Sequence, residues 1–95
     1  MTGKARRFLR AMASTMPAVV MIGKNGLDNP VIDSARAAIT ARELIKIKVL
    51  NNCEEEAKDI IPRLADMLGA ELIQIIGHNG VLYKKSKEAK IELPR

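Results

Sequence analysis

The chain has 95 residues, which corresponds to one small domain, and its composition is 47% hydrophobic but only 2% aromatic. Phe8 and Tyr83 are the only residues of the types Phe, Trp and Tyr, so the core must be aliphatic. The abundance of Ile, Leu and Val excludes a disordered chain, and the single cysteine, Cys53, excludes a disulfide scaffold or a thiolate zinc cage. The longest apolar stretch is far shorter than a membrane-spanning helix requires.

Basic residues gather toward both ends of the sequence. Residues 1–27 contain five basic residues and no acid, residues 28–83 contain six basic and nine acidic residues, and residues 84–95 contain five basic and two acidic residues. The formal net charge is +5, with two basic ends flanking a slightly acidic middle. Such asymmetry is typical of proteins that bind a polyanion, most often nucleic acid, although a merely soluble basic protein can have the same composition.

The first fifteen residues are rich in arginine and free of acids. Residues 4–14 place apolar side chains at helical spacing with basic side chains on the far side, which predicts a short amphipathic helix that Pro17 ends. Because the segment has this structural use, we expect it to belong to the fold and not to a cleaved organellar leader. Residues 18–22 form an apolar run bounded by proline and glycine, which predicts a buried strand.

After a glycine-containing turn, the sequence predicts a second helix and a second strand. Asp28 or Asn29 caps this helix, and Pro30 suits its first turn. Apolar residues then recur at helical spacing over residues 31–39, so the helix buries one face. Residues 44–50 alternate between apolar side chains and two lysines, which predicts a strand with one buried and one solvated face.

The third predicted helix starts near Glu54, after an asparagine cap at 51–52, and ends at Gly69. Carboxylates in its first turn would be favoured by the helix dipole. Pro62 falls inside the helical pattern, where it removes a hydrogen bond, so we expect a kink or a break near Asp59.

The last part of the chain predicts a β-hairpin. Residues 72–76 form an apolar strand, residues 77–80 have the composition of a hairpin turn, and residues 81–84 return antiparallel. The tail over residues 85–95 is basic, but Ile91 and Leu93 alternate with charges and should dock on the core. Helices between strands imply crossover connections, and hence a mixed sheet.

The turn between the first strand and the second helix has the residues of a backbone clamp. Gly23 and Gly26 let an anionic backbone approach closely, Lys24 supplies a movable cation, and Asn25 supplies a donor and an acceptor. The following helix would present free N–H groups and its positive dipole end to the same space. These features suit a phosphodiester, as in the GxxG loop of KH domains, although a plain strand-to-helix turn can have the same residues.

Other basic residues could extend this site. We expect the turn to lie at one end of the molecule together with the basic residues of the first helix and of the tail, and the second strand to add its lysines. Alternatively, these side chains are only a solvated strand face and a solvated tail. The candidate nucleic-acid-binding residues outside the turn are Arg6, Arg7, Arg10, Lys46, Lys48, Lys84, Lys85 and Lys87.

Two long runs carry a family resemblance: VVMIGKNGLDNPVIDSARAAITARELIKIKVL and GAELIQIIGHNGVLYKKSKEAKIELPR. With their signals IGKNGL, ELIKIKVL, QIIG, VLY and KIELP, they closely resemble the CRM domain, or YhbY family, named for chloroplast RNA splicing and ribosome maturation. The resemblance spans nearly the whole of residues 1–95. It implies an α/β RNA-binding fold similar to the C-terminal domain of translation initiation factor three, with the GxxG loop carried over onto 23–26 as the RNA contact.

The chain departs from the family pattern in two places. Pro62 interrupts the third helix, and Lys84 follows Tyr83 where many members have arginine, which argues against guanidinium stacking there. The sequence also lacks an aromatic platform for stacking bases in the manner of an RRM.

Residues with catalytic potential are few and isolated. His78 lies in the predicted hairpin turn, where a histidine is usually a surface residue, and Cys53 precedes a helix without a His or Lys partner. Residues 54–56 are three consecutive glutamates that a helix start explains, and the 23–26 turn lacks the spacing of a nucleotide phosphate loop. We therefore expect a protein that is not an enzyme and has no cofactor, metal or small-molecule substrate.

Taken together, the residues and the resemblance predict one compact α/β domain in the order helix-strand-helix-strand-helix-strand-strand, with helices packed on a four-stranded mixed sheet. We expect a cytoplasmic monomer that binds structured ribosomal RNA during assembly of the large ribosomal subunit. The first alternative is a basic protein-interaction module that docks on an acidic, ribosome-associated partner. Two others are an enzyme acting on a phosphate ligand, which lacks a catalytic cluster, and a DNA-duplex binder, which lacks a recognition helix.

Overall fold

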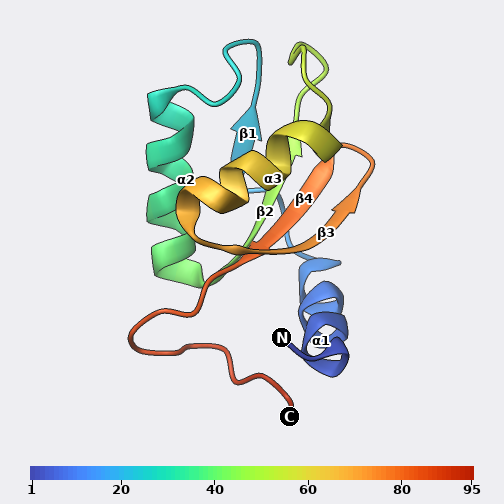
Figure 1. Ribbon diagram of the computed structural model, residues 1–95, viewed down its shortest axis with the longest axis vertical. Coiled ribbons are helices and arrows are strands. Elements are labelled where there is room, and N and C mark those ends of the chain that lie inside the picture. The colour runs from blue at the N-terminus through green and yellow to red at the C-terminus, as the bar shows by residue number, and fades with distance from the viewer.

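Three helices and four strands follow one another in the computed structural model, which describes residues 1–95 (Figure 1). Their order is the predicted one. No helix combines the length and the apolar character needed to cross a membrane. The elements are α1 (Gly3–Ala13), β1 (Val20–Ile22), α2 (Asn29–Arg42), β2 (Leu44–Val49), α3 (Ala57–Leu68), β3 (Glu71–Ile76) and β4 (Asn79–Tyr83).

The strands form one mixed sheet in the order β1-β2-β4-β3, which confirms the predicted fold class. β1 runs parallel to β2, whereas β4 lies antiparallel to both β2 and β3. The parallel pair needs a crossover, and α2 provides it. α2 and α3 cover one face of the sheet, and α1 packs against β2 and β3 on the other (Figure 1).

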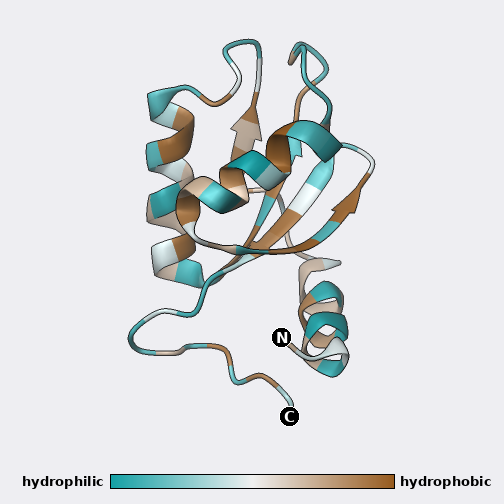
Figure 2. Ribbon diagram, viewed as in Figure 1, coloured by the Kyte–Doolittle hydropathy of each residue, from teal (hydrophilic) through white to brown (hydrophobic).

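This arrangement creates two aliphatic cores. The larger lies under α2 and α3, where Ile45 and Ile47 of β2 meet the apolar stripes of both helices. The smaller lies under α1, where Leu9 contacts a cluster that includes Leu44 and Tyr83. In Figure 2 the hydrophobic stretches of α2 and α3 accordingly alternate with hydrophilic ones along each helix. Because successive side chains of a strand point to opposite faces of the sheet, each residue of β2 belongs either to the face under α2 and α3 or to the face under α1.

The helix ends of α1 and α2 follow the capping rules. Thr2 caps α1, its hydroxyl accepting a 3.0 Å hydrogen bond from the Ala5 N–H. The Asp28 carboxylate caps α2 in the same way, accepting at 3.0 Å from the Val31 N–H, with proline in the first turn. Of the two predicted caps for α2, Asp28 is thus the one used.

The start of α3 was predicted wrongly. The helix begins at Ala57, not near Glu54, and neither Asn51 nor Asn52 caps it. After β2 the Leu50 N–H donates to the Ile22 carbonyl, and the Cys53 N–H donates to the Leu50 carbonyl. These two hydrogen bonds turn the chain at the end of the sheet, which delays the helix by about one turn.

Of the kink or break that the sequence predicts near Asp59, the break is absent, since α3 is continuous from Ala57 to Leu68 with Pro62 inside it. Pro62 is the sixth of the twelve residues of α3. Its missing N–H leaves the carbonyl of Lys58 without a helical partner, and Lys58 lies in an exposed first turn where water can replace the bond. The helix ends at Gly69 in the left-handed conformation, as predicted.

The C-terminal tail docks on the smaller core, as expected. Ile91 and Leu93 are half-buried and pack against this core. The tail is fixed by Glu43, a residue that the sequence did not single out: it is fully buried and has a positive φ of 65° between α2 and β2. Its carboxylate accepts hydrogen bonds from the backbone N–H groups of Ser86, Lys90 and Ile91.

The environment of Glu43 and Tyr83 shifts the pKa values of both side chains. The pKa of Glu43 is lowered, chiefly because the Ser86 N–H donates to its charged form, although burial opposes the shift. The pKa of Tyr83 is raised by burial and, secondarily, by the negative charge of Glu43. The tail is therefore held by a buried, ionised carboxylate.

Candidate nucleic-acid interface

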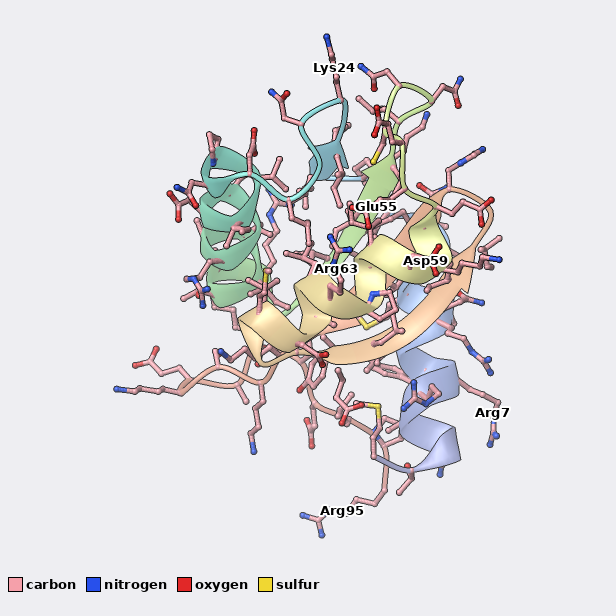
Figure 3. The ribbon with its side chains drawn as sticks, turned by 45° about the horizontal axis from the view of Figure 1, so that its top comes forward. Arg7, Lys24, Glu55, Asp59, Arg63 and Arg95 are labelled. Atoms are coloured by element: carbon pink, nitrogen blue, oxygen red, sulfur yellow. The ribbon has the colours of Figure 1, made fainter.

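The turn at Gly23–Gly26 projects from the end of the sheet at which β1 stops. The Gly26 N–H donates to the Gly23 carbonyl at 3.0 Å, which closes a tight turn with Lys24 and Asn25 at its corners. Both corner side chains are exposed and make no hydrogen bond or ion pair within the protein, and Figure 3 shows Lys24 pointing away from the body. Gly26 has a φ of +60°, which L-residues adopt only with strain. The turn thus presents a free cation and a free amide on a fixed backbone.

One part of the expected clamp is already engaged within the protein. The sequence predicted that the positive end of α2 would face the same space with free N–H groups. In the structure the Asp28 carboxylate occupies this helix end and accepts from Val31. A negative charge at this point competes with a phosphate, so the turn cannot rely on the helix dipole.

The loop between β2 and α3 lies beside this turn (Figure 1). A Cβ placed on Gly23 would lie 3.3 Å from Oδ1 of Asn52, and one placed on Gly26 would lie 3.9 Å from Oε2 of Glu55. The glutamates of this loop precede α3, contrary to their predicted place in its first turn. A carboxylate therefore approaches the proposed phosphate site.

Arg63 of α3 compensates the charge of this carboxylate. Its guanidinium donates two hydrogen bonds to the Glu55 carboxylate, of 2.5 and 3.0 Å. Figure 3 shows Arg63 and Glu55 near each other. The pKa of Arg63 is raised by the hydrogen bond and charge of Glu55 and, less strongly, by the charge of Asp59. The pair is eight residues apart across a loop, so no local sequence pattern indicates it.

The two lysines of β2 lie on the sheet face opposite α2 and α3, as the alternation predicted. Lys48 is exposed, and Lys46 is half-buried beside the C-terminal end of α1. Neither ammonium group makes an ion pair or a hydrogen bond. A shallow groove of about 230 Å³ separates Lys46 from Ala13 and Ser14 of α1.

The three arginines of α1 differ in their contacts. Arg6 donates to the carbonyls of Leu72 and Ile73 at 2.7 and 3.4 Å, and its guanidinium lies 3.6 Å from the Glu71 carboxylate. These carbonyls belong to the edge strand β3, where its pairing with β4 shifts register. Arg6 therefore stabilises a strand edge. Arg7 and Arg10 have no such partners.

The tail lysines differ in the same way. The ammonium group of Lys84 donates at 2.8 Å to the carbonyl of Leu68, the last residue of α3, and so caps the negative end of that helix. Lys85 and Lys87 are exposed and unpaired. Of the predicted basic candidates, Arg6 and Lys84 are thus already engaged by backbone carbonyls.

The structure does not gather all candidates at one end of the molecule, and that expectation is wrong. Lys24 lies at one end of the molecule, which is 39 Å long, whereas Arg7 and the C-terminal Arg95 lie toward the other (Figure 3). The reason is topological: α1 and the tail pack at the end where β1 begins, and the turn follows the end of β1. The β2 lysines lie between the two groups.

Other residues with potential chemistry remain isolated. His78 is exposed in the β3–β4 turn, and Cys53 is half-buried against the larger core. No group of three or more His, Cys, Asp or Glu side chains is arranged to hold a metal ion.

Comparison with known proteins identifies the family. A model of the CRS1/YhbY (CRM) domain matches residues 1–84. This chain belongs to the CRM domain family. It is 45% identical over 95 residues to the "Probable RNA-binding protein YqeI" of Bacillus subtilis, covering 99% of both chains. It is 41% identical over 92 residues to an "RNA-binding protein" of Haemophilus influenzae, covering 97% of this chain and 93% of that one.

A solved structure shares the fold of this CRM domain. The solution structure of the hypothetical protein SAV1595 from Staphylococcus aureus superposes with a TM-score of 0.73 at 37% identity, covering 99% of each chain. The α/β architecture inferred from the resemblance is thereby confirmed.

Proposed function

We propose that this protein binds structured ribosomal RNA during assembly of the large ribosomal subunit and acts by binding, not by catalysis. The proposal rests on its family, which is named for RNA splicing and ribosome maturation, and on relatives that are named RNA-binding proteins. The observation that carries it is the Gly23–Gly26 turn, whose Lys24 and Asn25 are exposed and free of internal partners.

The mechanism is recognition of the RNA backbone. Gly23 and Gly26 keep Cβ atoms away from the phosphodiester, Lys24 pairs with a phosphate, and Asn25 hydrogen-bonds phosphate or ribose oxygens. Because Asp28 occupies the end of α2, Lys24 supplies the positive charge that the helix cannot supply. The free cations that extend this contact are Arg7, Arg10, Lys46, Lys48, Lys85 and Lys87.

The first test is a fluorescence-anisotropy titration at several salt concentrations. It compares a structured fragment of large-subunit ribosomal RNA with a DNA duplex of matched length. We expect the RNA to be preferred at physiological salt, with a log–log salt slope that steepens by roughly 0.7 to 0.9 per phosphate neutralised. Equal and steeply salt-sensitive binding to both would contradict a specific RNA function and favour the acidic protein partner.

A matched pair of variants then locates the contact. We expect Lys24→Asp to weaken RNA binding about tenfold and to reduce the salt slope by about one. Lys58→Asp makes the same change of charge on an exposed side chain of α3, whose 3.3 Å pair with Glu56 is a surface contact of little energetic weight. Equal losses in the two variants would show that only net charge matters.

A further inference from the structure

Half of one sheet face is left uncovered. α1 covers this face at the end where β1 begins, and the half nearer the Gly23–Gly26 turn has no helix over it. Strand pairing places one row of side chains there and a second row at the border with α1, where Val81 is buried in the smaller core. One row consists of Met21, Lys48, Asn79 and Ile76, and the row nearer α1 consists of Lys46, Val81 and Gln74.

The uncovered face combines apolar, amide and cationic groups. Ile76 is 62% exposed and Met21 is 48% exposed, which is unusual for large apolar side chains on a sheet. The amides of Gln74 and Asn79 and the ammonium of Lys48 make no hydrogen bond within the protein. No acidic side chain belongs to either row.

The uncovered face lies between other cations that have no partner in the protein. Lys24 lies beyond one end of it, and the C-terminal end of α1, whose last turn contains Arg10, borders its other end through Ala13 and Ser14. An RNA strand that leaves the turn can therefore follow free positive charge across the sheet. A continuous duplex could use the cations, but it keeps its base faces stacked away from Ile76 and Met21.

We propose that this uncovered face binds a short unpaired RNA segment that adjoins the structured RNA bound at the turn. Ile76 and Met21 cover the faces of splayed bases, Gln74 and Asn79 hydrogen-bond base edges, and the β2 lysines pair with phosphates. This inference rests on the proposed function and adds to it a substrate class: a junction between paired and unpaired RNA.

The test compares two RNA hairpins with the same stem, one blunt and one carrying an unpaired extension of six nucleotides. We expect the wild-type protein to bind the extended hairpin about tenfold more tightly at physiological salt. The variants Ile76→Ser and Gln74→Ala should each lose most of the extra affinity for the extended hairpin, and both should retain wild-type affinity for the blunt hairpin. Lys24→Asp should weaken binding of both hairpins.

Met67→Ser is the control, because Met67 is a large exposed apolar residue on α3, on the opposite face, with an exposed fraction of 48% against 62% for Ile76. Equal wild-type affinity for the two hairpins would overturn the inference and leave the proposed function intact. A gain that persists in Ile76→Ser and Gln74→Ala, or that Met67→Ser also removes, would likewise overturn it. Failure of the wild type to bind either hairpin would contradict the proposed function itself.

Discussion

The two ends of the molecule carry positive charge in different ways. At the tail end, Arg6, Lys84 and Lys90 donate to backbone carbonyls, the last of them to Ala41 at 2.5 Å. Lys24 at the loop end and Lys48 of β2, which lies between the two ends, have no partner in the protein. These three cations of the tail end therefore stabilise helix ends and a strand edge, whereas Lys24 and Lys48 remain available for a ligand. The unpaired cations of α1 and the tail, Arg7, Arg10, Lys85 and Lys87, remain available as well. Formal charge alone does not distinguish the two roles.

The largest effect should come from the buried carboxylate that organises the tail end. Glu43→Gln keeps the side chain's shape but replaces one acceptor oxygen by an amide that faces the tail's N–H groups. We expect the midpoint of thermal unfolding to fall by roughly 5 to 10 °C, because buried donors lose their charged acceptor. Amide exchange at Lys90 and Ile91 should become fast, and RNA affinity at the loop end should change little.

A second substitution at Glu43 separates the effect of backbone strain on stability from the effect of the carboxylate. Glu43→Gly relieves the positive φ of 65° and removes the carboxylate as well. If the hydrogen bonds to the tail dominate, Glu43→Gly should be destabilised like Glu43→Gln. A glycine variant as stable as the wild type would show that backbone strain offsets the contribution of these bonds.

Lowering the pH should release the tail. The pKa of Glu43 is lowered in the folded protein from its ordinary value of 4.5. The stability that this group contributes is therefore complete above pH 4.5 and is lost as the pH falls through the lower, folded-state pKa. NMR shifts of the Ser86 and Lys90 amides should report this acid transition, and Glu43→Gln should lack it. A tail whose release on acidification is the same in Glu43→Gln as in the wild type would contradict the assigned role.

Substituting one lysine at each end should separate stability from binding. We expect Lys24→Gln to weaken RNA binding roughly fivefold, because it removes a phosphate contact, and to leave stability unchanged. Lys84→Gln should cost about 1 kcal/mol of stability through the lost contact with the end of α3, and should alter RNA affinity less than twofold. Chemical denaturation and anisotropy measure the two quantities. A large loss of affinity in Lys84→Gln would remove the distinction between the ends.

Much of the fold could be predicted because its determinants are local. Alternation along residues 44–50 assigned the β2 lysines to the solvated face, and Asp28 and Gly69 marked helix ends that the structure confirms. The Gly23–Gly26 turn was recognisable for the same reason, since its conformation depends on its own residues, among them Gly26 with a positive φ.

The remaining features depend on contacts between segments far apart in the sequence. Glu43 receives hydrogen bonds from residues 43 to 48 positions away, and Arg6 reaches carbonyls 66 and 67 positions away. No periodicity or spacing shows that such a side chain is already occupied. The late start of α3 likewise depends on a hydrogen bond between Leu50 and Ile22 on neighbouring strand ends.

The smallest predicted effect concerns the carboxylate beside the loop-end turn. Arg63→Gln leaves Glu55 uncompensated near Gly26, where its negative charge repels a phosphate. We expect RNA affinity to fall about threefold at low salt and the loss to disappear at high salt, because exposed charges are screened. The double variant Arg63→Gln/Glu55→Gln should recover wild-type affinity, since it removes both charges. If the double variant binds as weakly as the single one, Arg63 itself contacts the RNA, and the loop end extends onto α3.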